Sequence, residues 1–257
     1  MKCYNGEKYI VSFTSFGKRV PLIGKTVFSL QKQNYNNFHL VLTLHKNDLQ
    51  YIDETVQSFI DADLFEVLVA EEELGPHLKY YYSMLKYHNK PIITVDDDRV
   101  YHENMIRYLV EAYEVTPYKS VISNRAIKMQ RYGGKIIPYP FWTPFGLRPK
   151  EKSYIAMAEG FAGILYPPNC FENMNTKEFR NGTLTCKYDD DLYLRVLEIQ
   201  QKIPVTNSEF IGIKSFVRNV DEQMQYNLHE NQNKNNTNRI NMCYKFEKEL
   251  LRGWNLE

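Results

Sequence analysis

The sequence contains no long hydrophobic run. Nowhere in its 257 residues do about 18 apolar residues follow one another, which is the length that a membrane-spanning helix needs. The first residues also lack the apolar stretch and small-residue cleavage site of a signal peptide. We therefore expect a soluble, cytoplasmic protein that neither spans nor crosses a membrane.

Cysteine is scarce, and neither sign of charge is in excess. Cys3, Cys170, Cys186 and Cys243 show no Cys-x-x-Cys spacing, so we expect reduced thiols and no structural zinc. The 32 basic and 31 acidic residues leave a formal net charge of +1. No overall field would attract nucleic acid, and we expect no nucleic-acid partner.

Short apolar runs alternate with amphipathic stretches in the first half of the chain. Helical periodicity is found over Leu22–Gln33 and Asp48–Ile60. Alternating strands and helices indicate an α/β fold with a mostly parallel sheet and right-handed crossovers. Five runs are rich in β-branched and aromatic residues and are typical of buried strands: Tyr9–Thr14, Phe38–Leu44, Phe65–Ala70, Pro91–Val95 and Ser120–Ser123.

The alternation stops after about residue 125. Glycine, proline and aromatic residues crowd Gln130–Tyr154, which favours a long functional loop without regular structure. A further helix is predicted from Asp190 to Lys202. Asparagine dominates Asn231–Asn241, which we predict to be a loop that precedes a short terminal helix over Tyr244–Arg252.

An acidic triplet, Asp96, Asp97 and Asp98, directly follows one of the apolar runs. In an open α/β sheet, ligands bind beyond the carboxyl ends of the strands. Adjacent carboxylates repel one another without a cation, and their oxygen atoms suit Mg²⁺ or Mn²⁺, which in turn suit phosphate oxygens. The triplet therefore predicts a metal and a diphosphate, although solvated residues of a turn, one of them capping a helix near Glu103, would also explain it.

Five segments resemble, in the same order, the metal-dependent glycosyltransferases of the GT-A type, and in particular their family-two-like bacterial members. The likeness covers residues 9 to 200 and is carried by VSFTSFGKRVPLIGKTVFSLQKQ, LGPHLKYYYSML, PIITVDDD, GFAGILYPPNCF and CKYDDDLYLRV. It implies a Rossmann-like, mostly parallel sheet flanked by helices and an irregular acceptor-side C-terminal half. We expect a single domain over residues 1–257, with a nucleotide-sugar-binding half over about 1–125 and an acceptor and catalytic-base half over about 126–257.

The resemblance also implies a reaction. A sugar would pass from a nucleotide-diphosphate sugar, with a UDP-sugar favoured, to a glycan or lipid-linked acceptor, with inversion, in surface polysaccharide or glycoconjugate synthesis. Mn²⁺ or Mg²⁺ held by Asp96 and Asp98 would stabilise the leaving diphosphate. Lys79 would contact phosphate, or it is a solvated lysine of a helix. Asp97 would face the ribose or the sugar, and the remaining donor contacts would be Thr14, Ser15 and Arg19.

A second acidic triplet supplies the base that an inverting enzyme needs to take the proton of the acceptor hydroxyl. The resemblance favours Asp190 and Asp191, whereas another register makes Asp189 the base. The helix dipole also favours acids in a first turn without any catalytic duty. His229 is a further candidate metal ligand, although a histidine in a polar loop needs no such role.

Other features point to the acceptor. Gly160 and Gly163 would let the backbone form a wall close to the donor sugar and the acceptor. Basic residues in and near Gln130–Tyr154 are either solvated or attract an anionic membrane surface, giving a peripheral contact at the cytoplasmic face. These residues are Arg125, Lys128, Arg131, Lys135, Arg148, Lys150 and Lys152. Nothing in the sequence indicates the oligomeric state.

Two other classes of protein stay open. The run DDDRV fits the Asp-x-Asp-x-Val pattern of haloacid-dehalogenase-like phosphatases, with Asp96 as nucleophile, although that family carries the motif on its first strand and three predicted strands precede it here. A non-catalytic nucleotide- or carbohydrate-binding protein could keep the same fold without turnover.

Overall fold

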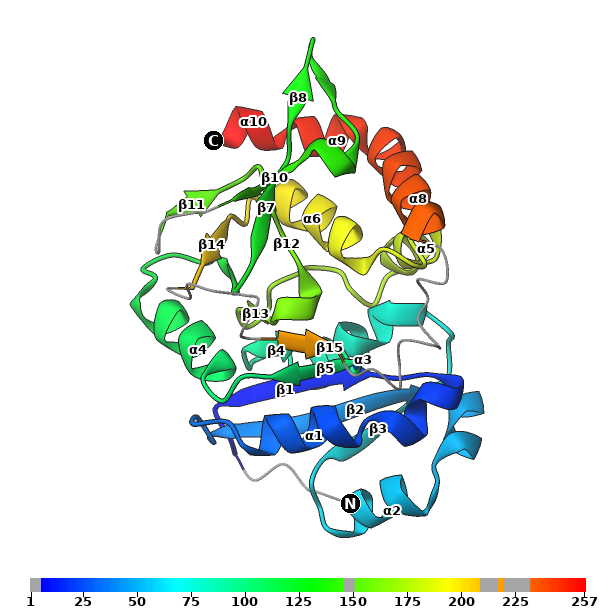
Figure 1. The fold of residues 1–257 in the computed structure, drawn as a ribbon. Helices are drawn as coiled ribbons and strands as arrows, with labels where there is room; N and C mark the ends of the chain where they lie inside the picture. The colour runs from blue at the N-terminus through cyan, green and yellow to red at the C-terminus, as the bar shows by residue number, and fades with distance from the viewer. Residues whose placement is uncertain (1–5, 146–150, 209–216, 220–231) are drawn as a thin grey trace.

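The computed structural model describes residues 6–145, 151–208, 217–219 and 232–257. Its centre is an eight-stranded sheet with the strand order β11-β14-β6-β13-β4-β1-β2-β3. Four strands from the first half of the chain run parallel to one another: β1 (Tyr9–Thr14), β2 (Phe38–His45), β3 (Glu66–Ala70) and β4 (Ile92–Thr94). They form the lower part of the molecule in Figure 1.

Four later strands complete this sheet, three of them from the second half of the chain. The strand β13 (Ile164–Tyr166) lies antiparallel between β4 and β6 (Val121–Ser123). The strand β14 (Val205–Asn207) runs parallel to β6, and β11 (Lys152–Ser153) pairs antiparallel at the edge. Only β13 and β11 therefore oppose the common direction, which confirms the predicted α/β fold with a mostly parallel central sheet.

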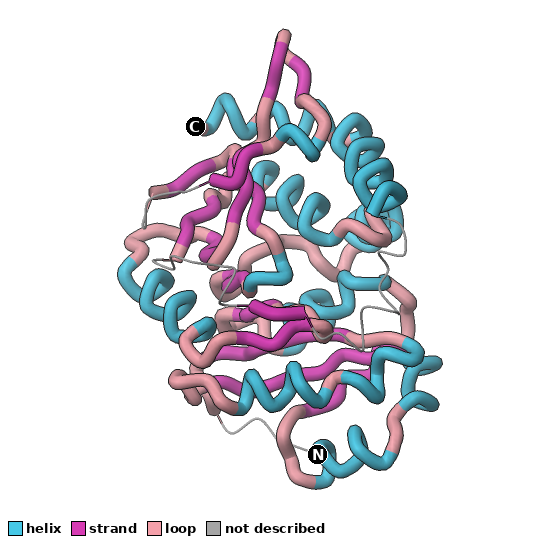
Figure 2. Tube along the Cα trace, viewed as in Figure 1, coloured by secondary structure: helices cyan, strands magenta, loops and turns pink. Residues whose placement is uncertain are grey.

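Helices cover both faces of the sheet, as Figure 2 shows. Side chains of β1 alternate between two cores, with Ile10 in one and Tyr9 and Val11 in the other, because successive residues of a strand point to opposite faces. One core includes residues of α1 (Gly24–Gln31), α2 (Glu54–Asp61) and α4 (Met105–Val115). The other includes residues of α3 (Leu78–Lys86), α5 (Lys177–Thr185) and α6 (Asp190–Gln200).

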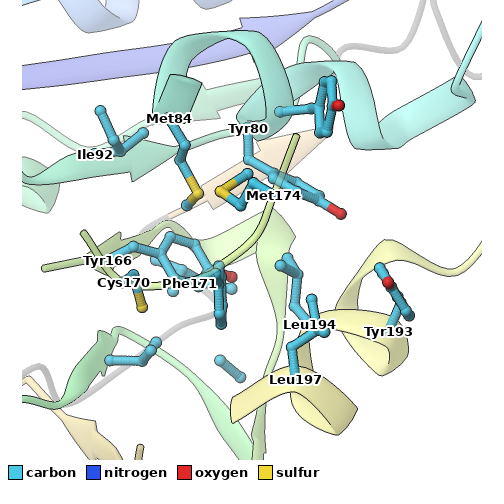
Figure 3. Close-up of a cluster of buried hydrophobic side chains, with 14 of the residues drawn as sticks. Tyr80, Met84, Ile92, Tyr166, Cys170, Phe171, Met174, Tyr193, Leu194 and Leu197 are labelled. Atoms are coloured by element: carbon cyan, nitrogen blue, oxygen red, sulfur yellow. The ribbon is translucent and has the colours of Figure 1, made fainter. Parts of the chain in front are cut away.

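The core on the α3 side joins the two halves of the chain. Figure 3 shows Tyr80 and Met84 of α3 facing Tyr166 of β13, with Leu194 and Leu197 of α6 beyond them. A cavity of about 230 Å³ is lined by Met84, Ile92, Cys170 and their neighbours. It lies at the start of β4, whereas the acidic triplet follows the end of that strand, so the cavity is separate from the predicted site.

A second layer lies above the central sheet in Figure 1. The strands β10 (Thr143–Phe145), β7 (Ala126–Lys128) and β12 (Ala156–Ala158) form an antiparallel sheet. It shares a third core with α6 and with the C-terminal helices α8 (Gln232–Lys245), α9 (Glu247–Leu251) and α10 (Gly253–Leu256). A hairpin of β8 (Arg131–Tyr132) and β9 (Lys135–Ile136) projects from this layer.

Short elements complete the described chain. The strand β5 (Arg99–Tyr101) pairs with β15 (Val217–Asn219). Five short 3₁₀ helices join larger elements: η1 (Gly17–Leu22), η2 (Lys46–Tyr51), η3 (Gly75–His77), η4 (Tyr139–Phe141) and η5 (Gly160–Ala162). In the described ranges, no helix is both long enough and apolar enough to cross a bilayer. The three cysteines described are free and buried, and Cys3 lies outside the described residues.

Three predictions of local structure were wrong. The helix expected over Asp48–Ile60 is split, because Ile52 is extended and the Asp53 carboxylate caps a new helix at the amide of Val56. Short strands occur within Gln130–Tyr154, where regular structure was not expected, while 146–150 lie outside the described residues.

The third error concerns the asparagine-rich Asn231–Asn241, which was predicted to be a loop. From Gln232 onward this segment belongs to α8. Asparagine is a poor helix former, yet packing of a helix against its neighbours regularly outweighs such propensities. Here Cys243 is buried in the third core, and Arg239 pairs with Asp189.

Candidate functional site

The first triplet lies at the point where the strand order reverses. The strands β2 and β4 lie on opposite sides of β1, and ligands of open α/β sheets bind at such switch points. Because β1 and β4 are parallel neighbours, the residues that follow them meet at one edge. Accordingly, the Ser15 hydroxyl donates to Oδ2 of Asp97 over 2.6 Å.

Asp97 is the most deeply buried member of this triplet. Arg19 Nε donates to its Oδ2 over 3.1 Å, and a terminal nitrogen of the same guanidinium pairs with Oδ1. Burial raises the pKa of Asp97 to about 6, although Arg19 opposes the rise. The predicted donor-side residues Ser15, Arg19 and Asp97 are thus in mutual contact. Thr14 ends β1 beside them and donates its hydroxyl to the carbonyl of Thr43 over 2.7 Å.

Asp96 and Asp98, the predicted metal ligands, have other partners. The side chain of Asp96 is 28% exposed, and its Oδ1 accepts from Lys79 Nζ over 2.9 Å. Asp98 Oδ2 lies 3.2 Å from Arg19, and its Oδ1 lies 3.1 Å from Arg99 Nε. Within the described residues this buried Oδ1 accepts no hydrogen bond with good geometry.

The carboxylates of Asp96 and Asp98 fit a divalent cation whose remaining ligands come from the substrate. In the described part of the chain, no group of three histidine, cysteine or acidic side chains is arranged to hold a metal. Mg²⁺ commonly binds through one or two carboxylates together with phosphate oxygens and water. The exposed Asp96 and the free acceptor capacity of Asp98 match that pattern. His229 lies outside the described residues.

Lys79 connects the first triplet to the second. Its Nζ lies 2.9 Å from Asp96 Oδ1 and 2.7 Å from Asp190 Oδ2. Burial alone would lower the pKa of Lys79, but the carboxylates of Asp190, Asp96 and Asp191 raise it well above its ordinary value. Lys79 is therefore a buried ammonium, and the solvated-lysine alternative is wrong.

The segment before Lys79 explains its position. Gly75 has a φ of +60°, and a Cβ there would come within 2.7 Å of the carbonyl oxygen of Lys187. His77 is fully buried; its Nε2 donates to the Cys186 carbonyl over 3.0 Å, and its Nδ1 lies 2.8 Å from the Tyr80 hydroxyl. The contact with Cys186 holds the start of α3 against the residues that precede the second triplet.

The second triplet begins α6, and its first carboxylate is fully engaged. Asp189 caps the helix by accepting from the amide of Leu192 over 3.3 Å. Arg239 of α8 donates to both of its oxygens, over 2.5 and 2.6 Å. Asp189 is thus occupied as a cap and as half of a bidentate ion pair.

Asp190 and Asp191 differ in their charge state. Burial would raise the pKa of Asp190, but Lys79 outweighs it and holds this pKa below the ordinary value. For Asp191, burial and then the charge of Asp190 raise the pKa. The carboxylate of Asp191 accepts from the Gly160 amide over 3.1 and 3.2 Å. Lys79 therefore favours the ionised form of Asp190, whereas burial and the charge of Asp190 raise the pKa of Asp191 to about 8.

Gly160 lies against this charged centre, at the start of η5. A Cβ at this position would stand 2.8 Å from both Asp191 Oδ1 and Lys79 Nζ. Gly163 lies farther along, where a Cβ would meet Met105 instead. The predicted glycine wall therefore touches the candidate base through Gly160 and packs on α4 through Gly163.

Sequence reasoning missed several charged neighbours of the site. Arg99 directly follows the first triplet and could have been noticed there, and Arg125 was considered only as part of a basic loop. Arg239 gave no local signal, because it lies in the segment that was predicted to be a loop. Trp142, one of the aromatic residues of Gln130–Tyr154, is buried and donates to the carbonyl of Ile137 over 2.8 Å.

Comparisons with known proteins identify no family. No family model and no curated protein sequence matches this chain. Solved structures that share part of the fold include S. aureus TarS (residues 1–349) in complex with UDP, with a TM-score of 0.46 and 14% identity over 80% of this chain and 59% of that one.

Two further structures are similar at the same low level. A putative glucose-1-phosphate thymidylyltransferase from Bacillus anthracis has a TM-score of 0.45 and 13% identity over 85% of this chain and 92% of that one. The mannosyltransferase PcManGT from Pyrobaculum calidifontis, in complex with GDP-Man and Mn²⁺, has a TM-score of 0.37 and 13% identity over 45% of this chain and 34% of that one. These likenesses do not assign an activity.

Proposed function

We propose that this protein is a metal-dependent GT-A glycosyltransferase that moves a sugar from a UDP-sugar to a glycan or lipid-linked acceptor with inversion. The observation that carries the proposal is Lys79, whose ammonium contacts carboxylates of both acidic triplets. The segments that resemble the donor side and the base side of such enzymes thus meet at one edge of the sheet.

The donor diphosphate would bind beyond the carboxyl ends of β1 and β4. Asp96 and Asp98 would hold Mn²⁺ or Mg²⁺, which supplies Lewis-acid stabilisation of the leaving diphosphate when bound. Lys79 is buried beside Asp96 and would add a second positive charge to the phosphates. Ser15, Arg19 and Asp97 form a linked group that would fix the nucleoside end of the donor.

Asp191 is our candidate for the general base. The acceptor oxygen would bond to the anomeric carbon as the bond from that carbon to the diphosphate breaks, and the hydroxyl proton would pass to Asp191. A base works best when its pKa lies near the working pH, and burial raises that of Asp191. Asp190, an anion paired with Lys79, would position the centre. The engagement of Asp189 with Arg239 argues against the register in which Asp189 is the base.

The exposed basic hairpin supports a peripheral role at a membrane. Arg131 and Lys135 are exposed, and the side chain of Tyr132 between them is 84% exposed. Cations and interfacial aromatic residues favour anionic lipid surfaces. Such a contact at the cytoplasmic face would bring a lipid-linked acceptor of surface polysaccharide synthesis to the enzyme.

Calorimetry with UDP tests the donor side of the proposal. We expect UDP to bind in the presence of Mn²⁺ and to lose most of its affinity in excess chelator, and Asp96→Asn to reproduce that loss. Asp53→Asn, the same change at a helix cap outside both triplets, is the matched control. Equal binding of UDP with and without metal would contradict the metal site, and the absence of any nucleotide binding would remove the proposal.

A further inference from the structure

Two arginines lie over the same aromatic ring beside the candidate base. The guanidinium carbons of Arg99 and Arg125 lie 5.3 and 5.5 Å from the centre of the Phe161 ring. Phe161 directly follows Gly160, whose amide binds Asp191. Three segments that are distant in sequence therefore bring two cations and one ring next to the centre.

Within the described ranges, each of these guanidinium groups contacts a carboxylate through only one of its three nitrogens. Arg99 approaches Asp98 through Nε, over 3.1 Å, and Arg125 donates to Glu159 through Nε. Among the residues whose side chains are described, none accepts a hydrogen bond from a terminal guanidinium nitrogen of either arginine. The two side chains are 20% and 30% exposed. Both arginines thus keep the outer edge that binds carboxylate or phosphate in a bidentate manner.

Glu159, the carboxylate that pairs with Arg125, is engaged through both of its oxygens. Glu159 accepts from Arg125 through one oxygen and from the Tyr139 hydroxyl, over 3.2 Å, through the other. The ring of Tyr139 in turn lies 4.6 Å from the guanidinium of Arg239. Three arginines and two rings therefore lie beside the two triplets, and, as far as side chains are described, Arg99 and Arg125 keep both of their terminal nitrogens for a ligand.

We propose that Arg99, Phe161 and Arg125 bind an oxyanion, a phosphate or a carboxylate, carried by the acceptor. This inference rests on the proposed function, because it takes Asp191 as the base. The donor phosphates are assigned to the edge that holds Asp96 and Lys79, whereas Phe161 adjoins Gly160 on the side of Asp191. An acceptor whose hydroxyl meets Asp191 would place a neighbouring anion on the two arginines and an apolar sugar face on the ring.

The test starts from the protein bound to UDP and Mn²⁺. This complex is titrated separately with three probes: glycerol 3-phosphate, glucuronate and glucose. We expect at least one of the two anions to bind about tenfold or more tightly than glucose, since charge-assisted bidentate bonds are the strong ones. Preference for the phosphate or for the carboxylate tells which oxyanion the site takes. Equal binding of all three probes would overturn the proposal.

Variants locate the binding. Arg125→Gln should remove the preference for the anion, and Arg125→Lys should retain part of it. Arg107→Gln is the matched control, because Arg107 also pairs with a glutamate and lies over a tyrosine ring, but on the outer surface of α4. If Arg125→Gln weakens UDP binding and leaves anion binding unchanged, the arginine serves the donor and the proposal is wrong. Thermal unfolding checks that each variant is folded. Arg99→Lys is a second variant, which tests the other arginine of the proposed anion site in the same titration.

The same titration without UDP and metal separates the two proposals. Anion binding that depends on Arg125, in a protein that binds no nucleotide, would sustain the anion site and remove the transferase. Nucleotide binding without anion preference would sustain the transferase and remove the anion site.

Discussion

The two acidic triplets have the same three letters, yet their surroundings give them different properties. Asp96–Asp98 follows a buried strand, and Arg19 and Arg99 approach it. Asp189–Asp191 begins a helix, where a cap, an amide and Arg239 engage it. In each triplet one carboxylate, Asp97 or Asp189, is held by an arginine through two nitrogens.

The comparison teaches that the roles of these aspartates are set by their ion-pair and hydrogen-bond partners, since the two triplets have the same composition. The carboxylate that is fully held by an arginine serves to fix the position of its triplet. One further carboxylate of each triplet, Asp96 or Asp190, pairs with the single ammonium of Lys79, so neither triplet is electrostatically independent of the other. Changing one aspartate at a time should therefore separate the two triplets, whereas changing Lys79 should affect both.

The largest expected effect follows from Lys79→Met. This change leaves buried carboxylates without their counter-ion, which typically costs about 3–5 kcal/mol of stability, and it should reduce both UDP affinity and transfer. Lys86→Met is the control, since Lys86 lies on the same helix with a glutamate partner but is 48% exposed. Urea unfolding and calorimetry measure the two effects. Normal behaviour of the Lys79 variant would mean that the bridge has no role.

The second prediction separates the triplets by function. Asp191→Asn should lower turnover by about 10²–10⁴-fold, as expected for loss of a general base, and leave UDP affinity nearly unchanged. Asp98→Asn should instead weaken UDP binding in Mn²⁺. Steady-state kinetics and calorimetry on the same preparations give both numbers. Full activity of Asp191→Asn together with an inactive Asp189→Asn would establish the other register.

A smaller effect is expected from Arg239, which positions the second triplet from α8. Arg239→Gln should lower kcat by about tenfold with little change in donor affinity, because it leaves Asp189 as a cap without its ion pair. Arg239→Lys should recover part of that loss. A control is Arg252→Gln, which changes an exposed arginine of the C-terminal region. A rise in donor Kd without a change in kcat would assign Arg239 to donor binding instead.

The smallest effect concerns a buried carboxylate outside both triplets. Burial would raise the pKa of Glu66, but hydrogen bonds from Lys86, Tyr87 and His39 hold it below the ordinary value of 4.5. A lowered pKa contributes stability above pH 4.5 that is lost as the pH falls through the folded-state pKa. Glu66→Gln should cost about 1–3 kcal/mol at neutral pH, with activity unaffected.

Urea unfolding of Glu66→Gln and the unchanged protein between pH 3 and 7, about the range in which carboxylates titrate, checks this prediction. The difference in unfolding free energy should shrink toward the acid end. A difference that grows on acidification would mean that the pKa of Glu66 is raised instead.

The first half of the fold could be predicted from local sequence because its strands are buried runs and its helices are amphipathic. The strand predicted over Tyr9–Thr14 has the same first and last residues as β1 in the structure. The helix split at Ile52 was missed, since the cap at Asp53 interrupts a periodicity that itself continues. For α8 the asparagine content of the sequence argued against a helix. The helix could not be predicted because a contact that stabilises it involves Asp189, about fifty residues earlier along the chain.

The sequence by itself determined the α/β class and the two acidic triplets, because hydrophobic period and charge clustering are local properties. Only the tertiary structure decided which carboxylate is locked, which is ionised and which has a raised pKa. Those states depend on burial and on Lys79, Arg19 and Arg239, which reach the aspartates from other elements. Coulomb interactions and desolvation depend on distance in space, and the chain alone does not state those distances.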